Sequence, residues 1–207
     1  MQYLAAALLG YLLGSIPSGL LVGRYLRGID IRKYGSKNLG ATNMFRVLGP
    51  KPALAVLLAD MGKGALAALS ALYFASDETA SVIGGVMAII GHSYPLFSDF
   101  KGGKGVATGL GVILALMPEL TLMVFAVWAA IVFFTRYVSL ASVGAAALVP
   151  AFAWYLEYPW RLFVFSLLAA LFVIARHKEN MKRLLRGQET KITPGSLEKF
   201  KSAKGKR

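Results

Sequence analysis

The residues that can carry chemistry in this 207-residue chain are cations, amides and hydroxyls. Cysteine is absent and there are two histidines, so a thiolate nucleophile and Cys-ligated zinc or iron–sulfur clusters are excluded, and we expect no metal and no cofactor. No serine lies in a nucleophile elbow, and Asp99 follows His92 by seven positions, which does not fit a His-x-x-x-x-Asp dyad. The available groups suit the binding of phosphates and the stabilisation of developing oxyanions.

The segment 91–109 is the most informative polar stretch, because it is unusually rich in glycine around Lys104. Glycines let backbone N–H groups approach an oxyanion, Lys104 adds a positive charge, and the apolar run that follows begins a helix whose N-terminus favours negative charge. The segment therefore predicts an anion cradle. It is not a Walker A loop, since neither Lys63 nor Lys104 is followed by Ser or Thr. The alternative is a flexible interfacial hinge with lysines that snorkel to the membrane surface.

Two further polar segments precede it. The stretch 14–19 (GSIPSG) interrupts an apolar run with a proline, which indicates either a functional helix break or a kinked helix packed by small residues. The stretch 35–46 (GSKNLGATNMFR) carries amides and hydroxyls for an anion, and Arg46 can make a two-pronged contact.

Ionisable and polar residues also occur within or beside the apolar runs. Asp60 and Lys63 share a helical face, so they either neutralise each other or mark function. Ser139 and Ser142 follow Arg136, and the stretch 176–180 (RHKEN) closes the last apolar run. Each is a weak signal alone, because serine caps helices and basic residues set membrane topology.

The elements that position these residues are transmembrane helices. Hydrophobic residues make up 57% of the chain and charged residues 16%, with a mean hydropathy of +0.59, whereas soluble domains have roughly 45 to 50% and about 25%. A span needs about 20 mostly apolar residues. Seven runs qualify or come close: 1–22, 52–75, 79–97, 102–117, 119–134, 138–155 and 159–175.

The distribution of charge predicts how these runs cross the membrane. The net charge is +13, and the basic residues lie in alternate connections and after the last run, which indicates an outside N-terminus and a cytoplasmic C-terminus. We therefore expect an all-α polytopic membrane protein with seven spans, some short or broken. Residues 1–191 form one transmembrane catalytic domain, and 192–207 form a basic, disordered tail. No basic soluble module is present, so nucleic-acid binding is not expected.

At these residues the sequence resembles the bacterial acyl-phosphate:glycerol-3-phosphate acyltransferase family of integral membrane enzymes. The resemblance extends to about residue 191. It rests on six stretches in this order: 14–17, 35–43, 60–64, 91–95, 100–108 and 136–139.

The resemblance implies transfer of a fatty acyl group from acyl phosphate to the 1-hydroxyl of glycerol 3-phosphate, giving lysophosphatidic acid and phosphate. An activated donor makes a covalent acyl-enzyme unnecessary. The implied partners are the two substrates and membrane lipid. The implied location is the bacterial inner membrane with the site on the cytoplasmic face, and the oligomeric state is left open, a monomer being compatible.

Under this hypothesis Lys104 and Arg46 neutralise phosphate or the carbonyl oxyanion, while Ser142, His177 and Asn180 orient glycerol 3-phosphate. The hydroxyl proton goes to His177, to His92 or to the donor phosphate, and we favour the phosphate because neither histidine has an evident carboxylate partner in the sequence. The remaining expected substrate-binding residues are Ser36, Asn38, Gly40, Ala41, Thr42, Asn43, His92, Lys101, Gly102, Gly103, Gly105 and Thr108.

Two other functions remain open from the residues alone. A transporter of a phosphorylated or other anionic solute would also use broken helices and intramembrane charges such as Asp60 and Lys63. A structural subunit is the other alternative. The short outer connections disfavour a transporter, which needs polar residues along both halves of its path.

Overall fold

The structure is a computed structural model that describes residues 1–193. The expected tail, 192–207, therefore lies outside the described residues except for its first two positions. In that part of the chain there are ten α-helices, two short 3-10 helices and no β-strand, which confirms the all-α prediction. In chain order the elements are α1 (Gln2–Gly14), α2 (Ser18–Arg27), η1 (Ile31–Lys33), α3 (Ala41–Leu48), α4 (Pro50–Ala75), α5 (Glu78–Ser93), η2 (Leu96–Ser98), α6 (Val106–Leu116), α7 (Pro118–Thr135), α8 (Val138–Tyr155), α9 (Trp160–Arg176) and α10 (Lys178–Leu185).

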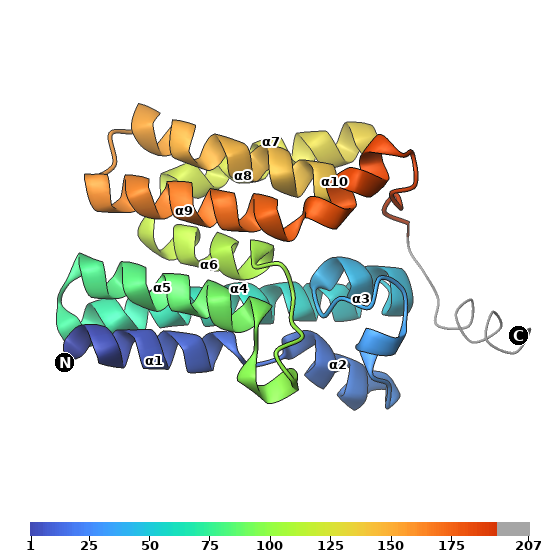
Figure 1. The fold of residues 1–207 in the computed structure, drawn as a ribbon, viewed down its shortest axis with the longest axis horizontal. Helices are drawn as coiled ribbons and strands as arrows, with labels where there is room; N and C mark the ends of the chain where they lie inside the picture. The colour runs from blue at the N-terminus through green and yellow to red at the C-terminus, as the bar shows by residue number, and fades with distance from the viewer. Residues whose placement is uncertain (194–207) are drawn as a thin grey trace, which may run out of the picture.

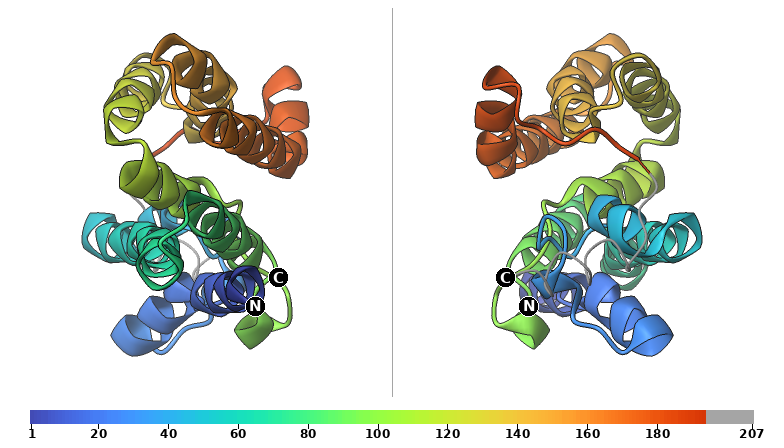
Figure 2. Two further views of the ribbon diagram at one scale, coloured as in Figure 1. Left: turned by 90° about the vertical axis from the view of Figure 1, so that its left-hand side faces the viewer. Right: turned by 90° about the vertical axis from the view of Figure 1, so that its right-hand side faces the viewer.

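The long helices form two groups. In the first, α4 packs against α1, α5 and α6, and α1 also packs against α5. In the second, α8 packs against both α7 and α9. Figures 1 and 2 show the two groups one above the other, with α6 between them, and α2, α3 and α10 toward the same end of the molecule. The polar connections are thereby gathered at one end of the bundle.

The predicted break in the first apolar run is present. Helix α1 ends at Gly14 and α2 begins at Ser18, with Pro17 between them, which has no backbone N–H to continue the helix. The break frees the carbonyl of Ile16, which accepts hydrogen bonds from Lys63 Nζ at 2.8 Å and from the Ser18 N–H at 3.0 Å. A charged residue of α4 thus satisfies the backbone group that the break leaves unpaired.

Small residues allow the helices of the first group to approach closely. A Cβ on Gly10 or Gly14 would overlap the backbone of α5, and one on Gly64 would overlap the backbone carbonyl of Thr108 in α6. In the same α4–α6 interface, Gly111 lies against the carbonyl of Met61. Close backbone approach through glycine is the packing mode that membrane helices favour.

The helices also show how the chain occupies a bilayer. By length and composition, five described helical segments can cross a membrane, or six if α9 and α10, which meet at a 55° bend, are counted as one span. The first of these segments, Gln2–Arg27, combines α1 and α2. The chain is thus a multi-pass membrane protein. Helix α6 has eleven residues, roughly 16 Å at 1.5 Å per residue, against a hydrocarbon core of about 30 Å. Helix α6 corresponds to the fourth predicted run, so the total of seven spans stays a prediction.

Candidate functional site

A cavity of about 480 Å³ lies between the two groups of helices. Its walls come from the 36–46 segment, from helices α4 to α10, from Lys104 in the loop before α6 and from Glu189. One part of the lining is polar and another is apolar. The apolar part comprises Val106, Leu110, Ile113, Val124, Phe125, Trp128, Val138, Ala145, Ala146, Val149, Ala169, Ala170 and Val173.

Four cationic side chains line the polar part: Lys104, Arg46, Arg176 and Arg183. Lys104 Nζ donates a hydrogen bond to Asn180 Oδ1. Arg46 donates to the Thr190 carbonyl at 2.6 Å, and its Nε is buried with no hydrogen-bond partner among residues 1–193. The Nε of Arg176 is likewise buried and has no hydrogen-bond partner among residues 1–193. Buried donors without partners are costly, so these two nitrogens indicate that the site is built to receive an acceptor.

Three carboxylates also line the cavity, and each pairs with a cation. Asp60 lies 2.8 Å from Lys63, Glu179 lies 2.9 Å from Lys182, and Glu189 lies 2.8 Å from Arg183. In the described part of the chain, Lys104, Arg46 and Arg176 form no ion pair with a carboxylate. The polar part therefore keeps three positive charges available to an anion.

Glu189 organises the polar part from the segment after α10. It accepts hydrogen bonds from Ser139 Oγ at 3.0 Å, Asn180 Nδ2 at 2.8 Å and Arg183 Nε at 2.8 Å. Burial alone would raise the pKa of its carboxyl group, but hydrogen bonds from Asn180, Arg183 and Ser139 hold that pKa below its usual value. A charged Glu189 holds Asn180 in the orientation in which its other amide atom, Oδ1, accepts from Lys104.

Lys104 lies outside the membrane spans, and the pKa of its side chain is strongly lowered. Burial lowers the pKa of its ammonium group to about 8; the charge of Glu189 opposes this change, and Arg183, Arg46 and Arg176 add to it. A bound anion would favour the protonated form.

The loop before α3 forms part of the cavity wall, and hydrogen bonds of two asparagine side chains fix its conformation. Asn43 Oδ1 accepts from the Ser36 N–H at 2.8 Å, and Asn43 Nδ2 donates to the carbonyls of Asn38 at 2.9 Å and Tyr34 at 3.2 Å. Asn38 Oδ1 in turn accepts from the Gly40 N–H at 2.8 Å. The Asn43 side chain is thus engaged in closing the loop, although the residue lines the cavity.

His177 and Ser142 lie where the two parts of the lining meet. His177 Nδ1 lies 2.8 Å from the Val173 carbonyl, which can only accept, so we assign the ring proton to Nδ1 and leave Nε2 free to accept a hydrogen bond. Ser142 Oγ donates to the Val138 carbonyl at 2.8 Å and accepts from Trp128 Nε1 at 3.4 Å. Both residues line the cavity.

Most of the expected site residues meet in this cavity. The lining includes Ser36, Asn38, Gly40, Ala41, Thr42, Asn43, Arg46, His92, Lys104, Ser142, His177 and Asn180. Five others do not line it: Lys101, Gly102, Gly103, Gly105 and Thr108.

These five have other places in the fold. Lys101 is exposed, Thr108 is buried against Gly64, and a Cβ on Gly102 or Gly103 would overlap His92. Gly105 precedes α6 with a φ of +82°, a conformation that side chains rarely adopt. The glycines therefore serve close packing and a helix start, so the backbone cradle expected from their frequency is not part of the cavity wall.

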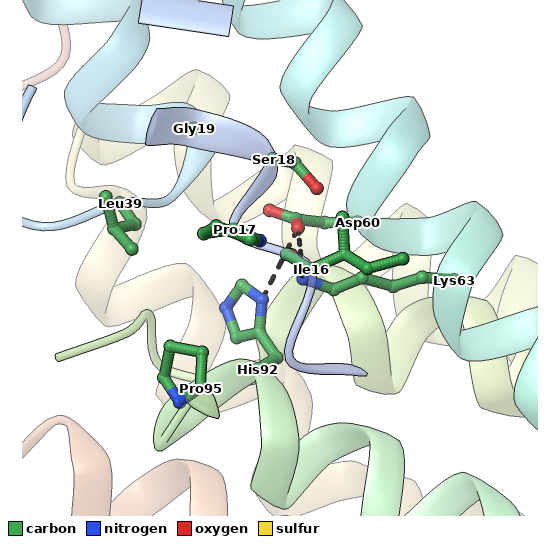
Figure 3. Close-up of a pocket in the computed structure, with 9 residues that line it drawn as sticks. All are labelled: Ile16, Pro17, Ser18, Gly19, Leu39, Asp60, Lys63, His92 and Pro95. Atoms are coloured by element: carbon green, nitrogen blue, oxygen red, sulfur yellow. Dashed lines mark hydrogen bonds and ion pairs between the residues drawn. The ribbon is translucent and has the colours of Figure 1, made fainter. Parts of the chain in front are cut away.

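The expectation that neither histidine has a carboxylate partner was wrong for His92. Its Nδ1 lies 3.4 Å from Asp60 Oδ1, and the same oxygen lies 2.8 Å from Lys63 Nζ, so the expected pairing of Asp60 with Lys63 is present. Figure 3 shows the three side chains pointing toward one another beside the break at Pro17. Asp60 and His92 lie 32 positions apart on the successive helices α4 and α5, so no spacing within one helix reveals the contact.

Several cavity residues were missed at the sequence level. Arg176, Arg183 and Glu189 line the cavity but are not among the expected site residues. Arg176, Asn180 and Arg183 are spaced by four and three positions, which is the spacing of one helical face. That periodicity was the available signal, whereas nothing local identifies Glu189.

Comparison with known proteins gives a consistent result. A family described as glycerol-3-phosphate acyltransferase matches residues 4–187. A relative of that name from Fusobacterium nucleatum is 47% identical over 192 residues, covering 93% of this chain and 99% of its own. Another from Syntrophomonas wolfei is 48% identical over 197 residues, covering 93% and 98%.

Two crystal structures are similar to this fold. Both are of PlsY, an integral membrane glycerol 3-phosphate acyltransferase, one in its glycerol 3-phosphate form and one in its lysophosphatidic acid form. Their TM-scores are 0.87 and 0.86 at 40% identity, and the first covers 93% of this chain and 96% of the PlsY chain. With the family match across nearly all of the described residues, these likenesses show that the chain belongs to the glycerol-3-phosphate acyltransferase family.

Proposed function

We propose that this protein transfers a fatty acyl group from acyl phosphate to the 1-hydroxyl of glycerol 3-phosphate, in the membrane and without an acyl-enzyme. The observation that carries the proposal is the two-part lining of one cavity. Cations with available charge occupy one part, and aliphatic and aromatic side chains occupy the other. Such a lining suits a molecule with a phosphate at one end and a hydrocarbon chain at the other.

The polar part has enough positive charge for two phosphate groups. Lys104, Arg46 and Arg176 are free of carboxylate partners in residues 1–193, and two of their nitrogens are buried donors without partners. Guanidinium groups bind phosphate oxygens in a two-pronged geometry, and the Lys104 ammonium adds a compact charge beside Asn180. The two molecules named for the PlsY crystal forms, glycerol 3-phosphate and lysophosphatidic acid, each carry a phosphate group.

The reaction needs no enzyme nucleophile. The oxygen of the 1-hydroxyl attacks the acyl carbonyl carbon, the bond between that carbon and the phosphate oxygen breaks, and phosphate leaves with the electron pair. The departing phosphate takes the hydroxyl proton. The chain supplies position and charge: His177 helps to orient glycerol 3-phosphate, and Lys104 and Arg46 offset the charge that develops on the carbonyl and the leaving group.

The apolar part accommodates the acyl chain. Moving a chain out of hydrocarbon costs about 0.8 kcal/mol per CH₂, so we expect the donor to enter laterally from the bilayer and to keep its tail against α6, α7 and α8. Residues 1–191 act as one catalytic domain in this proposal, since the cavity draws on helices from α3 to α10 and on Glu189.

We propose that the site lies on the cytoplasmic face of a bacterial inner membrane, because basic connections stay on the cytoplasmic side. Because the chain has no cysteine, a single cysteine placed at the exposed Lys37 or Glu157 reports its side without background labelling. We expect an impermeant maleimide added to intact cells to label Glu157→Cys and to leave Lys37→Cys unmodified. Labelling of both from outside would overturn the orientation.

The test of function uses purified protein, palmitoyl phosphate and glycerol 3-phosphate. We expect phosphate release that depends on the acceptor, lysophosphatidic acid as the second product, and no acyl adduct on the intact protein in acid-quenched mass spectra. An accumulating acyl-protein would contradict direct transfer. Uptake of glycerol 3-phosphate into liposomes with no chemical conversion would instead support the transporter alternative.

A further inference from the structure

The proposed chemistry leaves one buried ionic cluster without a role: Asp60, Lys63 and His92. Asp60 is 1% exposed, and Lys63 and His92 are each 6% exposed. One oxygen of Asp60 lies 2.8 Å from Lys63 Nζ and 3.4 Å from His92 Nδ1 (Figure 3). Burying charges is expensive, so a cluster of this kind indicates a requirement beyond stability.

One side of the cluster is anchored at the helix break. Lys63 Nζ donates to the Ile16 carbonyl at 2.8 Å while it pairs with Asp60. The Lys63 ammonium therefore joins the break between α1 and α2 to the carboxylate on α4. Asp60 is held in place from this side.

The other side of the cluster lies under the loop that carries Lys104. The Gly103 N–H donates to the His92 carbonyl at 3.0 Å, and a Cβ on Gly103 would overlap the His92 imidazole. The Gly103 carbonyl accepts from Arg176 at 2.9 Å. Gly103, the residue before Lys104, is thus held through its N–H by His92 and through its carbonyl by a cavity arginine.

We propose that Asp60 is a positioning residue that acts through His92: by holding the imidazole under Gly103, it fixes the loop that presents Lys104 to the substrates. This inference rests on the proposed function for its kinetic consequence. Asp60 needs no contact with either substrate in this role. A misplacement of about 1 Å in a catalytic group can cost about 100-fold in rate, so loss of the contact reduces turnover more than binding.

The kinetic test compares three variants. Asp60→Asn keeps the size of the side chain and removes its charge, but leaves the Lys63 ammonium buried without a counter-charge. The double variant Asp60→Asn/Lys63→Gln removes both charges, and Gln can still donate to the Ile16 carbonyl. Gly103→Ala disturbs the same contact from the loop and buries no charge. We expect each to lower kcat by about 10- to 100-fold, with KM for glycerol 3-phosphate changed less than about threefold.

Two controls match these changes. Asp77→Asn is the same substitution at the opposite end of α5, where the carboxylate accepts from Tyr3 and Thr79. Gly62→Ala adds a methyl group at a position with no neighbour within 4 Å. Both are expected to keep kcat within about twofold of the parent. A third comparison starts from His92→Ala. Adding Asp60→Asn/Lys63→Gln to that variant is expected to lower its kcat by less than about twofold, because the imidazole through which Asp60 acts is already absent.

A spectroscopic signal separates positioning from general loss of structure. A nitroxide on Lys101→Cys, an exposed residue of the same loop, can be introduced without background because the chain has no cysteine. We expect faster label motion in the Asp60→Asn/Lys63→Gln and Gly103→Ala proteins and unchanged motion in Asp77→Asn, with similar thermal unfolding in all. Equal label motion and equal kcat throughout would overturn the inference. An inactive parent would refute the proposed function, while the label would still report on the loop.

Discussion

Lys104 has its ammonium group in a cavity with three arginine side chains and the carboxylate of Glu189. Its pKa of about 8, lowered mainly by burial, places its loss of charge within the range in which the protein can be assayed. The charged form exists below that pH and disappears above it. An anion site that depends on Lys104 therefore weakens as pH rises.

The first prediction concerns this alkaline limb. We expect kcat/KM for glycerol 3-phosphate to fall as pH rises through about 8, because Lys104 loses its charge there and kcat/KM reports ionisations of the free enzyme. The substrate does not contribute to this change, since the second pKa of a phosphate monoester is about 6. In Lys104→Arg the limb should be absent up to about pH 10, because guanidinium stays charged. An unchanged limb in Lys104→Arg would assign it to another group. Lys104→Ala should abolish transfer in a protein that still folds.

A second residue-scale prediction uses Glu189. Its negative charge raises the pKa of Lys104, so Glu189→Gln should lower that pKa and move the alkaline limb to lower pH. Glu189→Asp retains the charge and provides the matched control, with the limb near its original position. The pH profiles of kcat/KM for the three proteins test this order. A limb that moves upward in Glu189→Gln would contradict the assigned electrostatic contribution.

At the scale of elements, the site depends on how closely α4 and α6 approach. Helix α6 begins two residues after Lys104, and its backbone at Thr108 lies against Gly64 of α4. Because this approach leaves no room for a Cβ, the glycine sets the distance between the two helices. Close contacts of this kind between helices fix the positions of the polar segments before α3 and before α6.

The third prediction compares two glycines of α4. Gly64→Ala places a methyl group against the Thr108 carbonyl and should destabilise the protein by about 1–3 kcal/mol, the usual cost of overpacking. Gly62→Ala, two residues earlier, has no neighbour within 4 Å and should be neutral or slightly stabilising. Thermal unfolding in detergent, followed by tryptophan fluorescence, measures both. Equal unfolding temperatures would show that α4 and α6 can separate without cost.

At the scale of the whole molecule, two groups of helices meet along α6 (Figure 2), and the cavity is lined by residues of both. The polar residues of the lining are divided between the two groups. Lys104 and Arg46 come from the first group, whereas Asn180, His177 and most of the apolar wall come from the second. The substrate chain should therefore lie between the groups.

The fourth prediction tests that location with two neighbouring residues of α8. Ala146 lines the cavity and Ala147 is exposed on the outer surface of the helix. Ala146→Phe should reduce kcat/KM for palmitoyl phosphate by about 10-fold or more and reduce it much less for a short-chain acyl phosphate, because the added ring occupies the tail space. Ala147→Phe should leave both within about twofold. Equal losses for long and short donors in Ala146→Phe would place the tail elsewhere.

The amino-acid sequence was sufficient to predict the helical membrane fold, the break near Pro17, and the convergence of Asn43, Lys104 and Asn180, and it gave the pairing of Asp60 with Lys63 as one of two alternatives. These features follow from hydropathy, from a spacing of three residues on a helix and from the alternation of basic connections. All are local or additive properties of the chain. The number of spans stays a prediction.

Tertiary structure alone decided which glycines line the cavity and which pack against other parts of the protein. Gly102 and Gly103 pack on His92, and Asp60 reaches His92 from another helix. Glu189 enters the site from a segment with no recognisable motif and engages Ser139, Asn180 and Arg183. Contacts between residues tens of positions apart depend on how helices are placed against one another. That placement is set by close packing of many side chains at once, which no spacing within a single segment encodes.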